Sequence, residues 1–179
     1  MTVYVALLRG INIGNRRIKM AALRGIAEGC GFAEVQTYLQ SGNIVFTARK
    51  GAAKVGTELH DAILDASGID TRVVIRTAAQ MDAIVKANPF ADRGATHKEL
   101  HVVFLYGKAD PKRVAAVDPA VYAPDELAVS GTEAYLHIPG GYGNSKIGND
   151  SLLRKLGLEG TSRNWRTCTA LAEMAGPSS

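Results

Sequence analysis

The chain reads Glu34-Val-Gln-Thr-Tyr-Leu-Gln-Ser-Gly-Asn-Ile-Val-Phe-Thr47 at the point that decides its fold. Apolar and polar residues alternate along Glu34–Leu39 and again along Asn43–Thr47, which is typical of strands with one buried face. Gln40-Ser-Gly-Asn43 joins these two runs, and its Ser-Gly pair favours a tight hairpin turn. The stretch therefore predicts two adjacent antiparallel strands.

The segments on either side of this hairpin complete a structural unit. Upstream, the apolar run Val3–Leu8 predicts a buried strand, and Lys19–Cys30 carries apolar residues at helical spacing. Downstream, Ala52–Ala66 predicts a second helix and Thr71–Ile75 a fourth strand. This βαββαβ order predicts a ferredoxin-like unit over residues 1–76, in which two helices cover one face of an antiparallel sheet.

The second half of the chain repeats much of this order. Residues 77–97 predict a connecting helix and linker, because Thr77 can cap a helix that Asn88-Pro89 ends. In residues 98–179 we expect a strand, a short helix, a hairpin turning at Ser130-Gly131 and two C-terminal helices, but no closing strand. The predicted fold class is α+β, with duplicated ferredoxin-like βαββαβ units and antiparallel sheets, the second unit incomplete.

Composition favours a globular, cytoplasmic protein. Hydrophobic residues make up 46% of the 179 residues, and no apolar run approaches the roughly 20 residues that span a bilayer. The N-terminus lacks the order of a signal peptide, so we expect no membrane association. Cys30 and Cys168 are too few for a disulfide framework, and neither they nor the histidines have metal-ligand spacing. We therefore predict no metal; the sequence identifies neither a cofactor nor an oligomeric state.

Positive charge is concentrated at the two ends of the chain, whose net charge is +4. Residues 1–24 contain five cations and no acid, and they include Arg9-Gly-Ile-Asn-Ile-Gly-Asn15. A similar segment, Gly140-Gly-Tyr-Gly-Asn-Ser-Lys-Ile-Gly-Asn149, lies near the other end. Glycines let backbone N–H groups approach a ligand while Lys and Arg supply charge, so both segments predict anion binding. Their glycine spacing and Ser-Lys order exclude Rossmann and Walker phosphate loops.

We expect these two segments and the start of the last helix to form one basic cleft between the units, holding a small anionic ligand that is phosphorylated or nucleotide-like. Arg163 and Asn164 are predicted in the first turn of that helix, where a cation opposes the helix dipole and needs an acid or an anionic ligand to compensate it. The alternative is purely structural, with turn-forming amides and solvated cations. The candidate ligand-binding residues are Arg9, Asn12, Lys19, Gln40, Ser41, Asn43, Tyr142, Ser145, Lys146, Arg163 and Asn164.

Two other functions stay open. An enzyme acting on such a ligand would stabilise charge with Arg9, Lys146 and Arg163, but the sequence offers no paired carboxylates and no nucleophile with a partner histidine, so catalytic residues are unknown. A nucleic-acid-binding protein of this fold would stack bases on aromatic residues of its central strands, which here offer only Tyr4 and Phe46. A small anionic ligand is therefore preferred over nucleic acid.

Six short blocks of sequence point to a family. In chain order they are Leu7-Leu-Arg-Gly-Ile-Asn-Ile-Gly14, Ile18-Lys-Met20, Thr37-Tyr-Leu-Gln-Ser-Gly-Asn43, Asn88-Pro-Phe90, Gly141-Tyr-Gly-Asn-Ser-Lys146 and Arg163-Asn-Trp165. Together they resemble the bacterial family catalogued as domain of unknown function 1697, nearly from end to end. The resemblance implies a duplicated ferredoxin-like fold and no established activity.

Overall fold

The computed structural model of the protein describes residues 1–147 and 151–176, which divide into two compact units. Unit 1 comprises Met1–Ala83 and the chain from Ala170 onward, and unit 2 comprises Ile84–Thr169. The first boundary falls in the connecting segment 77–97, and the second falls inside the last helix. The last part of the chain is therefore grouped with the first unit.

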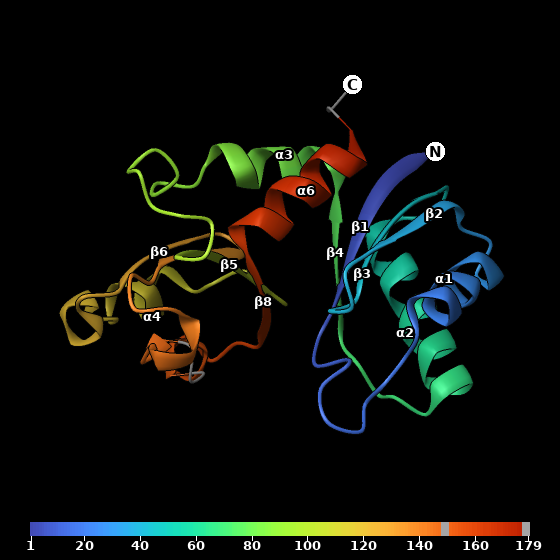
Figure 1. Ribbon diagram of the computed structural model, residues 1–179, viewed down its shortest axis with the longest axis horizontal. Coiled ribbons are helices and arrows are strands. Elements are labelled where there is room, and N and C mark those ends of the chain that lie inside the picture. The colour runs from blue at the N-terminus through green and yellow to red at the C-terminus, as the bar shows by residue number, and fades with distance from the viewer. Residues whose placement is uncertain (148–150, 177–179) are drawn as a thin grey trace. The chain divides into compact units, whose positions relative to one another are not determined.

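Unit 1 contains the βαββαβ order expected from the sequence. Its strands form one antiparallel sheet in the order β2-β3-β1-β4, and α1 and α2 cover one face of that sheet (Figure 1). This is the predicted ferredoxin-like topology. The elements are β1 (Thr2–Leu8), α1 (Met20–Gly29), β2 (Ala33–Tyr38), β3 (Asn43–Ala48), α2 (Ala52–Ser67), β4 (Val73–Thr77) and the following helix α3 (Ala78–Lys86).

The core of unit 1 lies between the sheet and these two helices. Successive side chains of a strand point to opposite faces, so every second residue of β1 faces the helices, namely Tyr4, Ala6 and Leu8. Ile44 and Phe46 of β3 join them. The helices contribute Leu23 and Ala27 from α1 and Val55, Leu59 and Ile63 from α2. The helical spacing read from the sequence is the spacing of this buried face.

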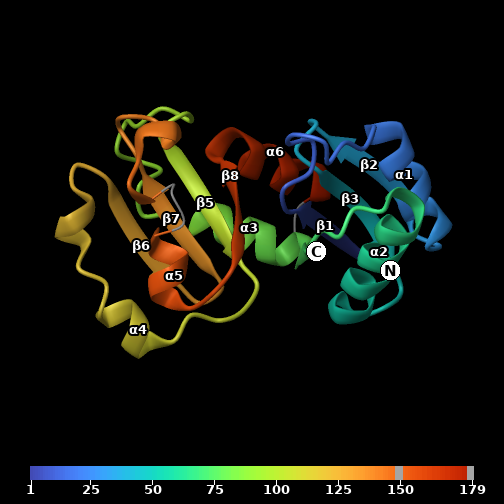
Figure 2. The same cartoon turned by 90° about the horizontal axis from the view of Figure 1, so that it is seen from below.

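Unit 2 forms a second four-stranded antiparallel sheet, in the order β6-β7-β5-β8 (Figure 2). The predicted hairpin is present, because β6 and β7 are joined at Gly131 and Thr132. The elements are β5 (Leu100–Leu105), α4 (Pro111–Ala115), the 3-10 helix η1 (Pro119–Tyr122), β6 (Glu126–Ser130), β7 (Glu133–His137), the 3-10 helix η2 (Tyr142–Asn144), α5 (Leu152–Leu156), β8 (Gly160–Asn164) and α6 (Trp165–Ala175). In the part of the chain described, no helix is both long and apolar enough to cross a bilayer.

The prediction that unit 2 lacks a closing strand is wrong, because β8 closes its sheet. Gly160-Thr-Ser-Arg-Asn164 contains no apolar residue, so its sequence carries no strand pattern. It is a strand because it pairs along β5, from His101 opposite Asn164 to Leu105 opposite Gly160. Glycine permits this approach, since a Cβ on Gly160 would lie 2.7 Å from the carbonyl oxygen of Phe104. Both halves of the chain therefore run βαββαβ and continue into a helix.

The two sheets also share a register. Val5 pairs with Arg76 in unit 1, and Val102 pairs with Arg163 in unit 2. Each arginine is buried and is the penultimate residue of its strand, and its Nη1 donates to the carbonyl of the preceding residue, at 3.0 Å for Arg76 and 2.9 Å for Arg163. The correspondence matches β1 with β5 and β4 with β8, residue by residue.

Candidate functional site

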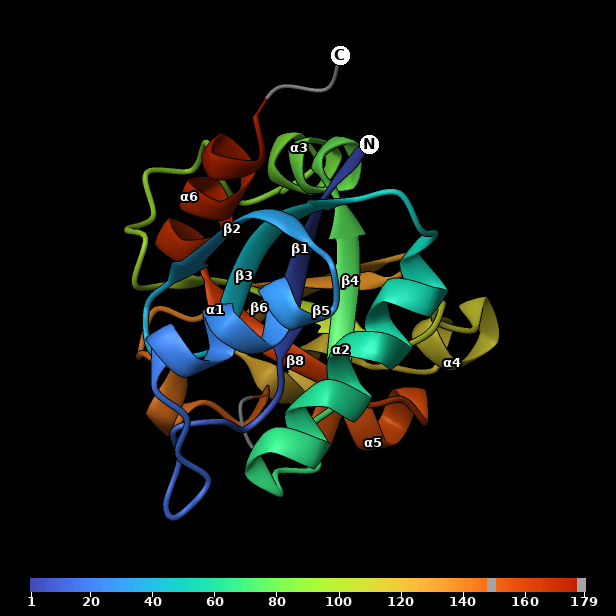
Figure 3. The ribbon, with the colours of Figure 1, turned by 90° about the vertical axis from the view of Figure 1, so that its right-hand side faces the viewer.

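Two connections meet at one end of the unit 1 sheet: the β1–α1 loop (residues 9–19) and the β2–β3 turn (residues 39–42). Figure 3 shows the β1–α1 loop projecting beyond the strands. The backbone N–H of Leu8, where the loop begins, donates to the carbonyl of Gly42 at 2.9 Å. Gly42 has a φ of +81°, and a Cβ on it would lie 2.5 Å from Cδ1 of Ile11. Only glycine fits this conformation and this contact together.

Asn12 fastens the loop to the turn with both ends of its side-chain amide. Its Nδ2 donates to the carbonyl of Gln40 at 2.5 Å, and its Oδ1 accepts from the backbone N–H of Ile18 at 3.0 Å. The backbone of Asn12 is left-handed, with a φ of +57°, which asparagine adopts more readily than most residues. The structure therefore uses this predicted ligand-binding amide to hold the loop.

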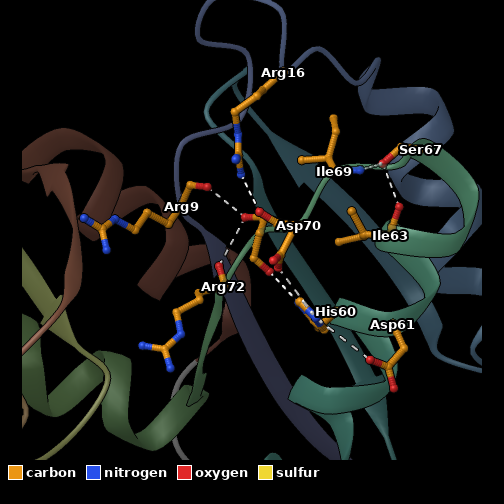
Figure 4. A network of polar contacts seen from close by, with 10 residues as sticks. Arg9, Arg16, His60, Asp61, Ile63, Ser67, Ile69, Asp70 and Arg72 are labelled. Atoms are coloured by element: carbon orange, nitrogen blue, oxygen red, sulfur yellow. Dashed lines mark hydrogen bonds and ion pairs between the residues drawn. The ribbon is translucent and has the colours of Figure 1, made fainter.

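Two arginines lie side by side where β1 and β4 continue past their ends. The backbone N–H of Arg9 donates to the carbonyl of Arg72 at 3.1 Å, and the carbonyl of Arg9 accepts from Oγ1 of Thr71 at 2.7 Å. Figure 4 shows both guanidinium groups extending in the same direction, away from His60 on α2. Backbone pairing therefore places two positive charges together beside the β1–α1 loop.

Arg16 and His60 hold the segment that carries this pair. Arg16 donates from Nη2 to the carbonyl of Asp70 at 2.7 Å and from Nε to the carbonyl of Gly10 at 2.8 Å. Nδ1 of His60 lies 2.7 Å from the carbonyl of Thr71 and is the donor, because a carbonyl can only accept. These bonds fix the backbone that leads into β4 (Figure 4).

The other unit 1 candidates lie in the same two connections or directly after the β2–β3 turn. Asn43 is fully buried and staples the hairpin, because its Nδ2 donates to the carbonyl of Tyr38 at 2.8 Å and to Oγ of Ser41 at 2.9 Å. Gln40 and Ser41 are exposed in the β2–β3 turn, and Lys19 is exposed at the last position of the β1–α1 loop. Five predicted residues thus lie in two touching connections of unit 1, and the sixth, Asn43, is the first residue of β3.

The glycine-rich loop of unit 2 uses its serine internally. Ser145 is buried, its Oγ donates to Oδ2 of Asp125 at 2.6 Å, and the same oxygen accepts from the backbone N–H of Ile147 at 3.0 Å. Both bonds close the loop upon unit 2. Ser145 therefore has a structural role that its sequence context, next to a lysine, did not indicate.

Tyr142 and Lys146 of the same loop differ in exposure. The ring of Tyr142 lies 4.7 Å from that of His101 and packs partly against the unit 2 core, whereas Lys146 is exposed with its Nζ 3.5 Å from the carbonyl of Val121. Residues 148–149 of the predicted segment lie outside the described residues, as does Asp150, near which the sequence predicts the first of the two C-terminal helices. The β1–α1 loop and this loop belong to different units, so their proximity stays a prediction.

The prediction that Arg163 and Asn164 lie in the first turn of the last helix is wrong. Both belong to β8, and α6 begins after them at Trp165. Oδ1 of Asn164 accepts from the backbone N–H of Thr167 at 2.9 Å, which caps the helix. Arg163 is only 7% exposed, and burial lowers the pKa of its guanidinium to about 10. Desolvation, not the helix dipole, is what its charge must overcome.

The described residues hold neither a cluster of metal ligands nor a reactive thiol. Across residues 1–147 and 151–176, no three His, Cys, Asp or Glu side chains gather as metal ligands would. Burial raises the pKa of the Cys168 thiol to about 12 and also raises that of Cys30, so neither is a reactive thiolate at neutral pH.

Arg72 is the residue that sequence reasoning missed. It follows Thr71 at the start of the predicted fourth strand, and a charged residue at a strand end carries no signal by itself. The signal lay in the topology, because the ferredoxin-like order puts the first and fourth strands side by side. Arg72 is thereby the neighbour of Arg9.

Comparison with known proteins gives a family and a fold. The family described as "Protein of unknown function (DUF1697)" matches residues 1–135. Among solved structures, the conserved bacterial protein SP0830 from Streptococcus pneumoniae is similar, with a TM-score of 0.79 over 99% of each chain and 20% sequence identity. A search of curated proteins finds no match. At that identity the structural likeness shows the fold alone.

Proposed function

Because the chain belongs to the DUF1697 family, whose description states no activity, we propose a function from its own residues: unit 1 binds a small anion, such as a phosphate ester or a nucleotide-like ligand, through Arg9 and Arg72. The observation that carries the proposal is the 3.1 Å backbone pairing of these two residues. The setting we propose is the cytoplasm, which fits the two free cysteines.

The chemistry of guanidinium groups supports a phosphorylated ligand. Arginine presents a rigid fork of N–H donors that matches two oxygens of a phosphate, and such charge-assisted bonds are stronger than neutral ones.

The placement of the aromatic residues favours a small ligand over RNA. Tyr4 and Phe46 are the aromatics of the two central strands, and both are buried in the core that faces α1 and α2. Stacking of bases on a ferredoxin-like sheet needs aromatic rings on its accessible face. The charge of Arg9 and Arg72 therefore suits one phosphorylated small molecule better than a nucleic-acid strand.

Isothermal calorimetry of the full chain with inorganic pyrophosphate and with AMP tests the proposal. Arg9→Gln and Arg72→Gln each remove charge-assisted hydrogen bonds worth about 1.5–3 kcal/mol, so we expect each to weaken binding at least about tenfold. Arg24→Gln is the matched control, because Arg24 is exposed on α1 and the same charge is lost there.

Two results would count against this function. One is the absence of measurable binding of either probe to the unaltered protein. The other is equal weakening by Arg24→Gln, which would show a response to net charge alone. Urea unfolding of the Arg9 and Arg72 variants separates a structural role from binding, since a structural pair would lower the free energy of unfolding without any ligand present.

A further inference from the structure

We propose that Ile13 and Leu39 form an apolar docking knob on unit 1, which inserts into an apolar pocket on an acidic surface of a partner protein. This surface is separate from the Arg9–Arg72 pair and does not depend on anion binding. It comprises the tip of the β1–α1 loop, the exposed leucine of the β2–β3 turn, and the cations Arg17 and Lys19.

The first support is the exposure of two aliphatic side chains on connections that touch each other. Ile13 is 68% exposed and Leu39 is 55% exposed. Each is one residue away from the 2.5 Å bond between Asn12 and Gln40, and Ile11 packs against Gly42 beneath them. A contiguous exposed apolar patch that is rimmed by polar residues marks a site of protein interaction.

The second support is that hydrogen bonds hold the loop tip in one shape. The N–H of Arg16 donates to the carbonyl of Ile13 at 3.1 Å, and the N–H of Asn12 donates to the carbonyl of Arg16 at 2.6 Å, which makes a tight hairpin around Gly14. Nε of Arg17 donates to the carbonyl of Gly14 at 3.0 Å. A preformed tip loses little conformational entropy on binding.

The third support is the backbone of Leu39. Its φ is +55°, in the left-handed region that a leucine adopts only at an energetic cost. Residues held in such conformations cluster at binding and switch sites. A leucine that is strained and exposed stabilises neither the turn nor the core of unit 1, so a role outside the fold accounts for it best.

Charge and side-chain type select the class of partner. Arg17 and Lys19 are exposed in the same β1–α1 loop as Ile13, and residues 1–24 contain no acid, so an acidic surface is complementary. Aliphatic side chains cannot stack on bases as aromatic ones do, which disfavours nucleic acid. Together the two side chains have fewer carbons than a myristoyl chain, which alone binds membranes only marginally. A partner protein remains the best match.

The test begins with a photo-crosslinking amino acid placed in the full chain at position 13 or 39, inside cells that normally make the protein. Val121 in unit 2, which is 46% exposed, gives the control position. We expect one protein adduct from positions 13 and 39 that is absent from 121. The captured protein is then purified, and its Kd for the unaltered chain is measured by calorimetry.

Two substitutions decide whether the knob makes that contact. Ile13→Ser and Leu39→Asn are each expected to weaken binding of the purified partner about tenfold, while Leu39→Asn keeps or raises the melting temperature because asparagine tolerates a positive φ. The proposal is overturned if either variant binds the partner as tightly as the unaltered chain does. Equal adducts at all three positions, or an adduct to a second copy of this chain, would also overturn it. The same holds if the two substitutions weaken binding to phosphatidylglycerol vesicles or to single-stranded RNA instead of binding to a protein.

Discussion

Units 1 and 2 share a backbone register but differ in charge at corresponding positions. In unit 1 the N–H of Arg9 donates to the carbonyl of Arg72 at 3.1 Å, and in unit 2 the N–H of Tyr106 donates to the carbonyl of Glu159 at 3.0 Å. The same backbone hydrogen bond therefore joins two arginines in unit 1 and a tyrosine and a glutamate in unit 2. A shared backbone does not imply a shared ligand.

The adjoining strands extend this contrast. Asn43 pairs with Leu7 in unit 1, and Glu133 pairs with Phe104 in unit 2. Backbone pairing constrains where a residue lies but leaves its side-chain chemistry open. Anion binding is accordingly proposed for unit 1 alone.

The largest difference between the units is expected at their hairpin glycines. Gly42→Ala combines a positive φ, costing roughly 1–2 kcal/mol, with overlap against Ile11, costing roughly 1–3 kcal/mol, so we expect a loss of about 3 kcal/mol. Gly131→Ala, in the unit 2 hairpin, has a φ of +61° and open space, so we expect only about 1 kcal/mol. Urea unfolding of the full chain measures both. Equal losses would mean that the contact with Ile11 relaxes freely.

A smaller difference is expected at the helix that follows each closing strand. Thr77 caps α3, accepting from the N–H of Gln80 at 3.1 Å, while Oε1 of Gln80 accepts from the N–H of Thr77 at 2.8 Å. Thr77→Ala and Asn164→Ala should each cost about 1 kcal/mol. Gln80→Ala should cost about half as much, because it removes only the bond that Gln80 returns to Thr77. Thermal unfolding of the three variants checks this order. An unchanged melting temperature for Gln80→Ala would show that the bond from Gln80 back to Thr77 does not stabilise the protein.

The smallest difference is a pH dependence that arises from His101 in unit 2. Burial lowers the pKa of His101, whose counterpart in β1 is Tyr4. As pH falls below about 6.5, the unfolded chain binds a proton that the folded protein resists, so stability should decrease with falling pH until His101 itself protonates. His101→Tyr should flatten this slope between pH 7 and 5, measured by urea unfolding. His97 is exposed, so His97→Gln is the control. If His97→Gln flattens the dependence of stability on pH as much as His101→Tyr does, the effect does not come from the burial of His101.

Much of the fold was readable in the sequence because local pattern and tertiary burial agree there. The Gln40-Ser-Gly-Asn43 turn and the helix apolar spacing report directly on the hairpin and on the buried face of unit 1. β8 was unreadable because its residues are polar and its strand conformation comes from pairing with β5. The positions of Arg163 and Asn164 were missed for the same reason.

The candidate site was predictable only in part. Glycine, amides and cations indicated the β1–α1 loop, and the hairpin pattern indicated the β2–β3 turn. No local pattern shows which polar atoms form hydrogen bonds within the chain itself. The amide of Asn12 and the hydroxyl of Ser145 are both engaged in holding loops. Arg72 depended on strand order, which is a property of the whole sheet.

Gly42 also sets a limit on redesign. Because its bare Cα lets Ile11 rest on the hairpin, the β1–α1 loop and the β2–β3 turn interlock as one piece. Transplanting the loop onto another scaffold of this topology would require carrying the hairpin with it, glycine included. Lengthening either connection alone would separate Leu8 from its partner carbonyl and undo the other.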